Sequence, residues 1–172
     1  MAPTKLIPTM PAGDFFLEID GIKGEATDAT HKDKIQLQSF AWGCSNAGRF
    51  AENSGGGAGK AVFQDFSFTM AMNIASPDLF LSCATGKHIA KAQLICRKAG
   101  GKQEEFLKVE FKDILISSYQ TGASSHGDPV PTESISFNFA IVKFEYAAQK
   151  SKGGGLDKPV IRGYDIKQQK PV

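Results

Sequence analysis

The sequence predicts a mostly-β fold, namely an antiparallel two-sheet β-barrel with one short flanking helix. Three observations support this prediction. Apolar and polar residues alternate at period two over several stretches, which is the pattern of half-buried strands. Two of these stretches change phase partway along. The chain also contains 13 Phe and a single Trp without long helical stretches, and aromatic residues favour strands.

The clearest alternation lies in residues 61–72. Its even positions are apolar: Val62, Phe66, Phe68, Met70 and Met72. The odd positions from 65 to 71 are small or polar, so one face of this strand is expected to be buried and the other exposed.

A hairpin is expected from residues 91–98 and 106–112, which both alternate. In the first segment the apolar set is Ala92, Leu94 and Cys96, and the opposite set is Lys91, Gln93 and Arg97. In the second segment Leu107, Val109 and Phe111 alternate with Lys and Glu. Gly100-Gly101 between them supplies the positive φ that a tight turn requires, so two adjacent antiparallel strands are predicted.

The phase changes occur in residues 35–42 and 135–146. Ile35 and Leu37 give way to Phe40 and Trp42, and the odd apolar positions 135–141 give way to the even positions 142–146. A strand that changes phase needs a bulge, or it leaves one sheet and enters another. Strands of this kind predict a barrel built from two sheets.

One helix is predicted from Pro77 to Thr85. Ser76 precedes Pro77 as a candidate N-cap, and Asp78 complements the positive end of the helix dipole. Gly86 is a candidate terminator. The apolar stripe expected to pack on the barrel is Leu79, Phe80 and Cys83.

Length and composition indicate one domain without disulfide staples. We expect residues 14–172 to form this domain, with a C-terminal tail at 149–172, and residues 1–13 to form a flexible N-terminal arm. The three cysteines, at irregular spacing, are expected to be buried free thiols. The net charge of +2 argues against a nucleic-acid partner. No apolar run approaches the ~20 residues of a membrane span, and no signal peptide is visible.

Three arrangements that suggest chemistry fail on inspection. The glycine-rich run ending at Gly59-Lys60 has Ser54 and Ala61 where a phosphate loop needs Gly and Ser or Thr. Ser125, His126 and Asp128 lie on one loop, whereas triad members converge from distant segments, so a polar turn is the better interpretation. His31 and His88 are isolated. The sequence therefore predicts no catalytic, metal-binding or cofactor-binding residue, and no enzyme.

Several stretches together resemble the haemolysin-coregulated protein (Hcp) family, the tube subunit of the bacterial type VI secretion system. They are DGIKGE at 20–25, SFAWG at 39–43, FQDFSF at 63–68, CATGKH at 83–88, RKAGG at 97–101 and SSYQTG at 117–122. The similarity runs from about residue 14 to about residue 147 in matching order and spacing. GYDIK at 163–167 is similar to the ending of one subset of the family.

The resemblance implies a hexameric ring that stacks into a hollow tube. Its implied partners are further copies of itself, the spike protein, the contractile sheath, the baseplate and small effector proteins carried in the lumen. It also implies residence in the bacterial cytoplasm before firing, followed by secretion through the machine without a signal peptide. Direct membrane insertion is not expected.

Two groups of residues are expected to serve assembly. By resemblance, the long loop at 46–60 reaches the neighbouring ring, and its candidate stacking residues are Asn53, Ser54, Gly55, Gly56, Gly57, Ala58, Gly59 and Lys60. The lumen of a carrier tube needs a polar wall without strong charge, and the candidates are Ser67, Thr69, Ser134, Ser136 and Asn138.

Two other functions remain open from the residues alone. One is a monomeric ligand-binding β-sandwich, such as a carbohydrate-binding module. Such modules usually expose aromatic residues, whereas here the aromatic residues are expected on the buried phase of each strand. The other is a small hydrolase that uses His126 or His88.

Overall fold

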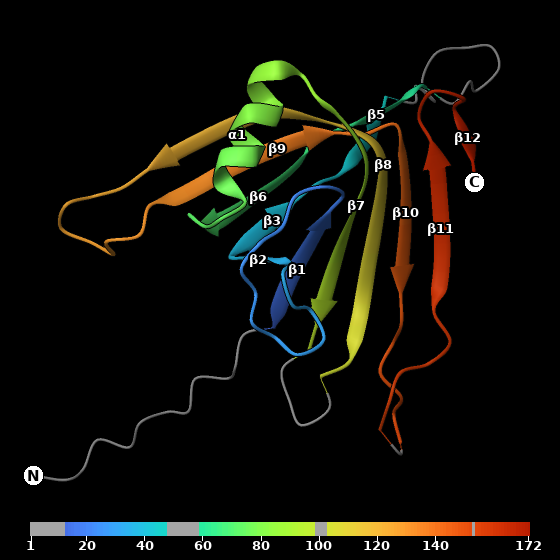
Figure 1. Cartoon of the computed structure of the whole chain (residues 1–172). Coiled ribbons are helices and arrows are strands. Elements are labelled where there is room, and N and C mark those ends of the chain that lie inside the picture. The colour runs from blue at the N-terminus through green and yellow to red at the C-terminus, as the bar shows by residue number, and fades with distance from the viewer. Residues whose placement is uncertain (1–12, 48–58, 99–102, 153) are drawn as a thin grey trace, which may run out of the picture.

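The structure is a computed structural model that describes residues 13–47, 59–98, 103–152 and 154–172. In this part of the chain the only helix is α1 (Ser76–Thr85). The strands, in chain order, are β1 (Asp14–Ile19), β2 (Ile35–Leu37), β3 (Ser39–Ala41), β4 (Cys44–Asn46), β5 (Ala61–Phe63), β6 (Phe66–Ala71), β7 (His88–Arg97), β8 (Glu105–Gly122), β9 (Thr132–Asn138), β10 (Ile141–Tyr146), β11 (Val160–Asp165) and β12 (Lys170–Pro171). The mostly-β fold with one short helix is confirmed (Figure 1).

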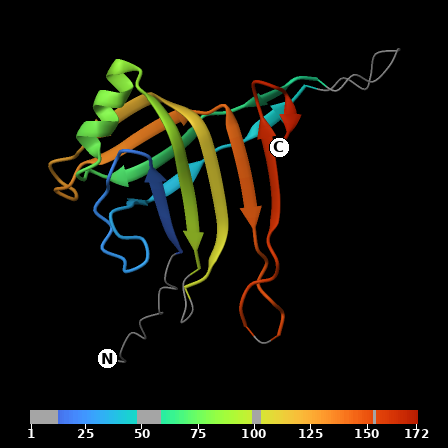
Figure 2. The same cartoon turned by 45° about the vertical axis from the view of Figure 1, so that its right-hand side comes forward.

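The strand pairings close into a barrel. From β8, antiparallel pairing runs through β7, β1 and β2 in one direction and through β9, β6 and β3 in the other. Gln38 joins β2 to β3, and its N–H donates to the Thr69 carbonyl oxygen at 2.8 Å. Strands β10, β11 and β12 extend the same sheet beyond the barrel (Figures 1 and 2). Residues 160–165 and 170–171 of the expected tail therefore belong to the sheet.

Both predicted phase changes mark places where the chain changes its pairing partner. β2 pairs with β1, but β3 pairs with β6. β9 pairs with the second half of β8, and β10 pairs with the first half. The corner between β9 and β10 is filled by Phe139 and Ala140, which are both buried. The two layers are thus one ten-stranded sheet folded over at β8, whose register shifts between Ile116 and Ser118.

An aromatic cluster fills the barrel. The ring of Phe66 lies 4.9 Å from that of Phe111 and 5.0 Å from that of Phe137, measured between centroids. These three side chains are fully buried, and they come from β6, β8 and β9 respectively. The core therefore joins both layers, as the period-two pattern predicts.

The alternating stretch at 61–72 is two strands and not one. Phe66, Phe68 and Met70 are buried in β6 as predicted. Val62 lies in β5, which pairs only with β4 in a separate two-stranded ribbon, and 61% of its surface is exposed. Met72 follows the end of β6 and is also exposed. The expectation that Val62 and Met72 are buried was wrong, because period two reports the face of a residue but not whether another layer covers it.

The predicted helix forms, but its N-terminal cap differs. Ser76 lies inside α1 and Ala75 is the N-cap, without a side-chain cap bond. The Oδ1 of Asn73 accepts instead from the N–H of Ala75 at 2.9 Å. Gly86 ends the helix at φ 64°, as predicted, because glycine adopts this left-handed conformation without steric cost.

The helix is fastened to the barrel by a buried carboxylate. The Ser76 hydroxyl donates to Oε2 of Glu133 on β9 at 2.7 Å, and the Tyr119 hydroxyl donates to Oε1. Burial and the Glu133 carboxylate raise the pKa of Tyr119 to about 12, so this phenol stays a hydrogen-bond donor at neutral pH. Glu133 occupies a position on the buried phase of its strand, which was the available sequence signal for this contact.

Candidate assembly surfaces

The predicted lumen residues lie together on one outward sheet face. Ser67 and Thr69 on β6 are register partners of Ser136 and Ser134 on β9, and Asn138 continues the same face. The Ser39 and Thr69 hydroxyls lie 2.6 Å apart across the β3–β6 pair. The outward residues of β3, β6 and β9 include no charged side chain. This hydroxyl face is therefore polar, and one carboxylate lies beside it: Asp65 accepts from the Ser117 hydroxyl, whose oxygen lies 3.2 Å from that of Ser136.

The stacking loop falls mostly outside the described residues. Asn53, Ser54, Gly55, Gly56, Gly57 and Ala58 belong to the segment 48–58, which is not described. Gly59 and Lys60 are described and lead directly into β5. Gly59 packs so closely that an added Cβ would lie 2.9 Å from the Ala47 carbonyl carbon.

A second surface is an aromatic groove between the extended sheet and the β4–β5 ribbon. It is a hollow of about 320 Å³ lined mainly by Trp42, Cys44, Phe63, Val142, Arg162 and Tyr164. The rings of Phe63 and Tyr164 stack at 5.5 Å, and Trp42 lies 5.9 Å from Phe144. Phe144, Tyr146 and Val160 carry the apolar surface along β10 and β11, and all three are exposed.

A third surface is the helix patch, formed by Ile74, Phe80 and Leu81. Their exposed fractions are 61%, 55% and 56%. Phe80 was expected to pack on the barrel with Leu79 and Cys83, but only Leu79 is fully buried. Phe80 turns outward and its ring lies 5.9 Å from the ring of the partly buried Tyr119.

The exposed aromatic residues also correct the expectation that aromatic side chains fall on the buried phase. Phe80, Phe144 and Tyr146 are all exposed. Clustered apolar side chains at the surface of a folded chain mark interaction sites more often than isolated ones do. The aromatic groove and the helix patch are therefore candidate protein contacts.

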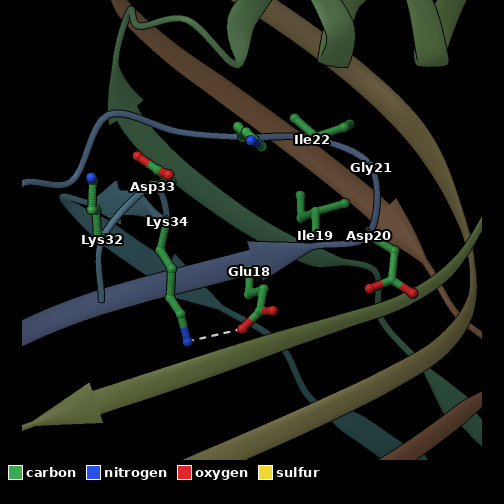
Figure 3. Close-up of a pocket in the computed structure, with 9 residues that line it drawn as sticks. Glu18, Ile19, Asp20, Gly21, Ile22, Lys32, Asp33 and Lys34 are labelled. Carbon is green, nitrogen blue, oxygen red and sulfur yellow. Dashed lines mark ion pairs between the residues drawn. The ribbon is translucent and has the colours of Figure 1, made fainter. Parts of the chain in front are cut away.

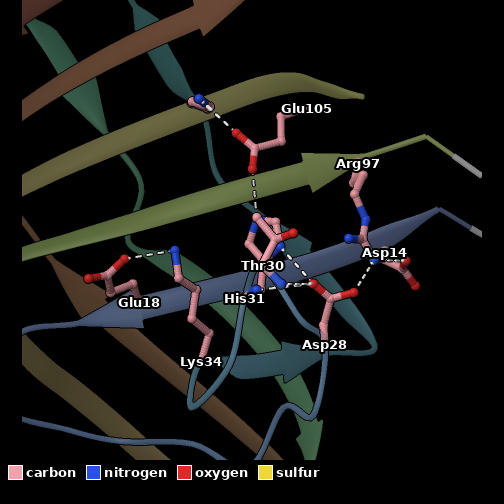
Figure 4. Close-up of polar contacts among 9 residues, drawn as sticks. Asp14, Glu18, Asp28, Thr30, His31, Lys34, Arg97 and Glu105 are labelled. Atoms are coloured by element: carbon pink, nitrogen blue, oxygen red, sulfur yellow. Dashed lines mark hydrogen bonds and ion pairs between the residues drawn. The ribbon is translucent and has the colours of Figure 1, made fainter. Parts of the chain in front are cut away.

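A buried ionic cluster, which sequence reasoning missed, holds the 22–34 segment against the barrel (Figure 4). Arg97 was expected on the polar face of its strand, but it is 4% exposed. Its Nη2 donates to Oδ2 of Asp14 and to Oδ2 of Asp28, both at 2.8 Å. The guanidinium lies 5.1 Å from the centroid of the Phe16 ring. Because of Arg97, with a smaller contribution from His31, the pKa of Asp28 is held well below its usual range.

His31 completes this cluster as a buried histidine whose two ring nitrogens both have carboxylate partners. It is 1% exposed and its ring stacks on Phe16 at 4.5 Å. Nε2 lies 2.8 Å from Oε1 of Glu105 and Nδ1 lies 3.2 Å from Oδ1 of Asp28. We interpret the cluster as structural, since its carboxylates, the imidazole and the Arg97 Nη2 contact one another (Figure 4), although the buried Nε of Arg97 has no hydrogen-bond partner.

A polar hollow of about 320 Å³ lies where β1 turns back at Gly21 (Figure 3). Three lysines (Lys23, Lys32, Lys34) and three carboxylates (Glu18, Asp20, Asp33) line it, so its charges balance. Lys34 Nζ lies 2.9 Å from Glu18 Oε2. Within the described residues no group of three or more His, Cys, Asp or Glu side chains is arranged to hold a metal ion.

The residues of the rejected triad form an exposed turn. Ser125 Oγ lies 3.0 Å from Nδ1 of His126, but Asp128 Oδ1 accepts from the backbone N–H of Val130. The carboxylate is thus used by the turn and does not orient the imidazole. His88 is also exposed and lies 3.1 Å from Oδ1 of Asp113.

The cysteines are free thiols, as expected, but they are not all buried. Cys96 is buried and its burial raises the pKa of the thiol to about 12, so it is an inert packing residue. Cys83 is partly buried, and Cys44 is exposed at the aromatic groove. The expectation of burial was wrong for Cys44 because β4 lies in the ribbon outside the barrel. No helix among the described residues is both long and apolar enough to cross a bilayer.

Comparison with known proteins gives consistent results. Residues 16–146 match the family described as "Type VI secretion system effector, Hcp". The chain is 41% identical over 158 residues to a Pseudomonas aeruginosa protein named hcp1, covering 91% of this chain and 97% of that protein.

Solved structures agree with this match. Hcp1 from Salmonella typhimurium is 34% identical with a TM-score of 0.74, over 94% of this chain and 99% of its own. A type VI secretion system effector from Yersinia pestis is 33% identical with a TM-score of 0.72, over 88% of this chain and 99% of its own. A structure described as a type six secretion system protein reaches a TM-score of 0.88 at 28% identity, over 94% of this chain and all of its own.

Proposed function

This chain belongs to the Hcp family of type VI secretion tube proteins, a structural and non-enzymatic family that forms hexameric tubes, and we propose that its own copies close into hexameric rings that stack as the shaft of the secreted tube. The observation that carries this proposal is the pair of exposed apolar surfaces, the aromatic groove and the helix patch, on a chain that is similar to tube proteins over most of its length. In a closed ring every copy has a neighbour on each side, so both surfaces are buried on every copy.

The ring is tested by mass and by image. Purified protein at micromolar concentration is examined by native mass spectrometry and by negative-stain electron microscopy. A particle of about 111 kDa, six times the 18.5 kDa chain, together with ring-shaped images would support the proposal. A monomer at every concentration would instead favour the single-copy ligand-binding module.

The partners and location follow as part of the same proposal. The tube contacts the contractile sheath on its outside, the baseplate at its base and the spike protein at its tip, and it carries small effector proteins in its lumen. The chain resides in the bacterial cytoplasm before firing and leaves through the machine. These partners are inferred from family membership, and each can be tested by co-purification from cells that assemble the machine.

The hydroxyl face is the proposed wall of the lumen. Ser67, Thr69, Ser134, Ser136 and Asn138 form a continuous polar surface across β6 and β9, with a single carboxylate, Asp65, bonded to the adjacent Ser117. Such a surface suits a channel for folded cargo, because it neither binds apolar side chains strongly nor attracts one sign of charge.

Replacing Ser136 by Arg is expected to reduce effector retention while leaving rings intact. Ser136 is half-buried at the centre of this face, and its hydroxyl contacts those of Ser117 and Ser118. An Arg there projects bulk and charge from the face into the proposed lumen. Co-purification of an effector with the ring measures the effect. The matched control is Ser125→Arg, on the exposed turn, and equal retention in both variants would count against the assignment.

The long connection between β4 and β5 is proposed to join stacked rings. Its candidate stacking residues are those at 53–60, of which Gly59 and Lys60 are described. The β4–β5 ribbon to which it is attached pairs with no other strand among the described residues, and an isolated two-stranded ribbon is marginally stable by itself. A contact with the next ring would stabilise it.

Deleting residues 54–59 is therefore expected to leave hexamers intact but to weaken ring-on-ring assembly and secretion. Tube length in electron micrographs and the amount of protein in the culture supernatant measure the effect. The control shortens the exposed turn at 124–129, which is not expected to alter stacking. Equal tube length and secretion in the loop variant would show that the loop has no stacking role.

A further inference from the structure

The two apolar surfaces lie on opposite sides of the molecule. In both views α1 lies at the upper left and β11 at the right (Figures 1 and 2). A contact that pairs a patch with itself gives only dimers, whereas a ring requires each copy to present two different patches that fit each other. One copy thus already carries the two surfaces that a head-to-tail ring needs.

The shapes of the two surfaces are complementary. The helix patch is convex, because Phe80 and Leu81 project from a short helix whose inner face is occupied by Leu79, and the exposed Ile74 lies just before its N-cap. The aromatic groove is a hollow bounded by β10 and β11 on one side and by the β4–β5 ribbon on the other. A helix laid in an apolar groove is a recurring mode of protein recognition.

The charges are complementary as well. Asp78 lies in the first turn of α1, three residues before Leu81, which places these two side chains on the same helix face. No basic residue lies in the last turn. Arg162 lines the groove and is the register partner of Phe144. Neither Asp78 nor Arg162 has an oppositely charged side chain within 4.0 Å among the described residues.

We propose that, in the ring, the helix patch of each copy packs into the aromatic groove of the next copy, with Asp78 facing Arg162 of that neighbour. This inference rests on the proposed ring and adds to it which surfaces meet and in which order around the ring. The contact buries the exposed side chains of Ile74, Phe80 and Leu81 against Trp42, Phe144 and Tyr164.

A single cysteine tests the contact, because the native Cys44 already lines the groove. In Leu81→Cys the new thiol faces Cys44 of the next copy. Mild oxidation is expected to give a ladder of covalent species up to the hexamer on a non-reducing gel, since a head-to-tail contact links every copy to two others. The ladder should disappear in Leu81→Cys with Cys44→Ser. Val130→Cys, exposed on the β8–β9 connection, is the control for chance collisions.

Charge exchange provides an independent test. Asp78→Arg and Arg162→Asp alone are each expected to raise the protein concentration needed for ring formation by about tenfold or more, because like charges then meet at every contact of the ring. The double variant should recover most of the loss, since it restores an opposite pair.

The outcomes separate this contact from the ring itself. Wild-type protein that stays monomeric overturns both. Rings in the wild type, together with no cross-link that depends on Cys44 or with covalent dimers only, overturn the contact and leave the ring. Full assembly of both single charge variants contradicts the pairing of Asp78 with Arg162.

Discussion

Replacing Arg97 by Ala is expected to lower the free energy of unfolding by about 3 kcal/mol, a value at the lower end of the range for breaking a buried ion pair. The guanidinium is 4% exposed and donates to both Asp14 and Asp28. Its removal leaves two carboxylates facing each other without a cation and opens space beside Phe16. The loss stays near the lower end because both carboxylates still reach water, at 34% and 21% exposure.

Urea unfolding of the assembled protein measures this loss. Arg97→Lys is the matched control, because it keeps the charge but cannot donate to both carboxylates in the same geometry, so an intermediate loss is expected. Lys98→Ala, at the next position of the chain, should change stability by much less. An Arg97→Ala variant as stable as the wild type would show that the cluster does not hold the 22–34 segment.

Acid provides a second measurement of the same cluster. Because Arg97 lowers the pKa of Asp28 in the folded state, the ionised carboxylate adds stability above about pH 4, the ordinary pKa of Asp. This stability is lost as the pH falls toward the folded-state pKa, since the unfolded chain then binds the proton first. The wild type should therefore lose stability below about pH 4 more steeply than Arg97→Ala, in which the pKa of Asp28 returns toward its ordinary value.

The same cluster shows where sequence reasoning stops. Alternation placed Arg97 correctly on the face opposite to Leu94 and Cys96. It could not reveal that the 22–34 segment covers that face, because this cover comes from residues more than sixty positions away, with Asp28 separated from Arg97 by 69 positions. The nearby Ile95 was the available signal, since an apolar residue on a nominally polar face suggests that both faces are covered.

Local patterns were reliable where the local chain decides the structure. Gly86 ends α1, and the phase changes at 35–42 and 135–146 mark real changes of pairing partner. The direction of Phe80 was not predictable in this way, because a short helix with apolar residues at 79, 80, 81 and 83 has two possible inner faces. The barrel contact through Leu79 and the bonds of Ser76 to Glu133 select one of them. The outward direction of Ser67, Thr69, Ser134 and Ser136, by contrast, needed only period two, whereas their role as a lumen wall stays a prediction.

Replacing Phe66 by Ala is expected to cost the most, about 3–5 kcal/mol, the usual range for removing a buried aromatic side chain. Phe66 is fully buried at the centre of the aromatic cluster, with ring contacts to Phe40, Phe68, Phe111 and Phe137. These partners come from four different strands, β3, β6, β8 and β9. The cavity left by Ala therefore loosens both layers at once, and the surrounding rings are too stiff to fill it completely.

Thermal and urea unfolding at fixed protein concentration measure the effect, because assembly makes stability depend on concentration. Phe66→Leu is the matched control, since it keeps most of the volume and should lose clearly less than Phe66→Ala. Phe106→Ala gives the comparison at a half-buried ring of β8 that lies outside the central cluster, and a smaller loss is expected there too. Equal losses in Phe66→Ala and Phe106→Ala would mean that the layers are joined elsewhere. A large loss specific to Phe66 would instead show that this cluster is where the two layers of the barrel are joined.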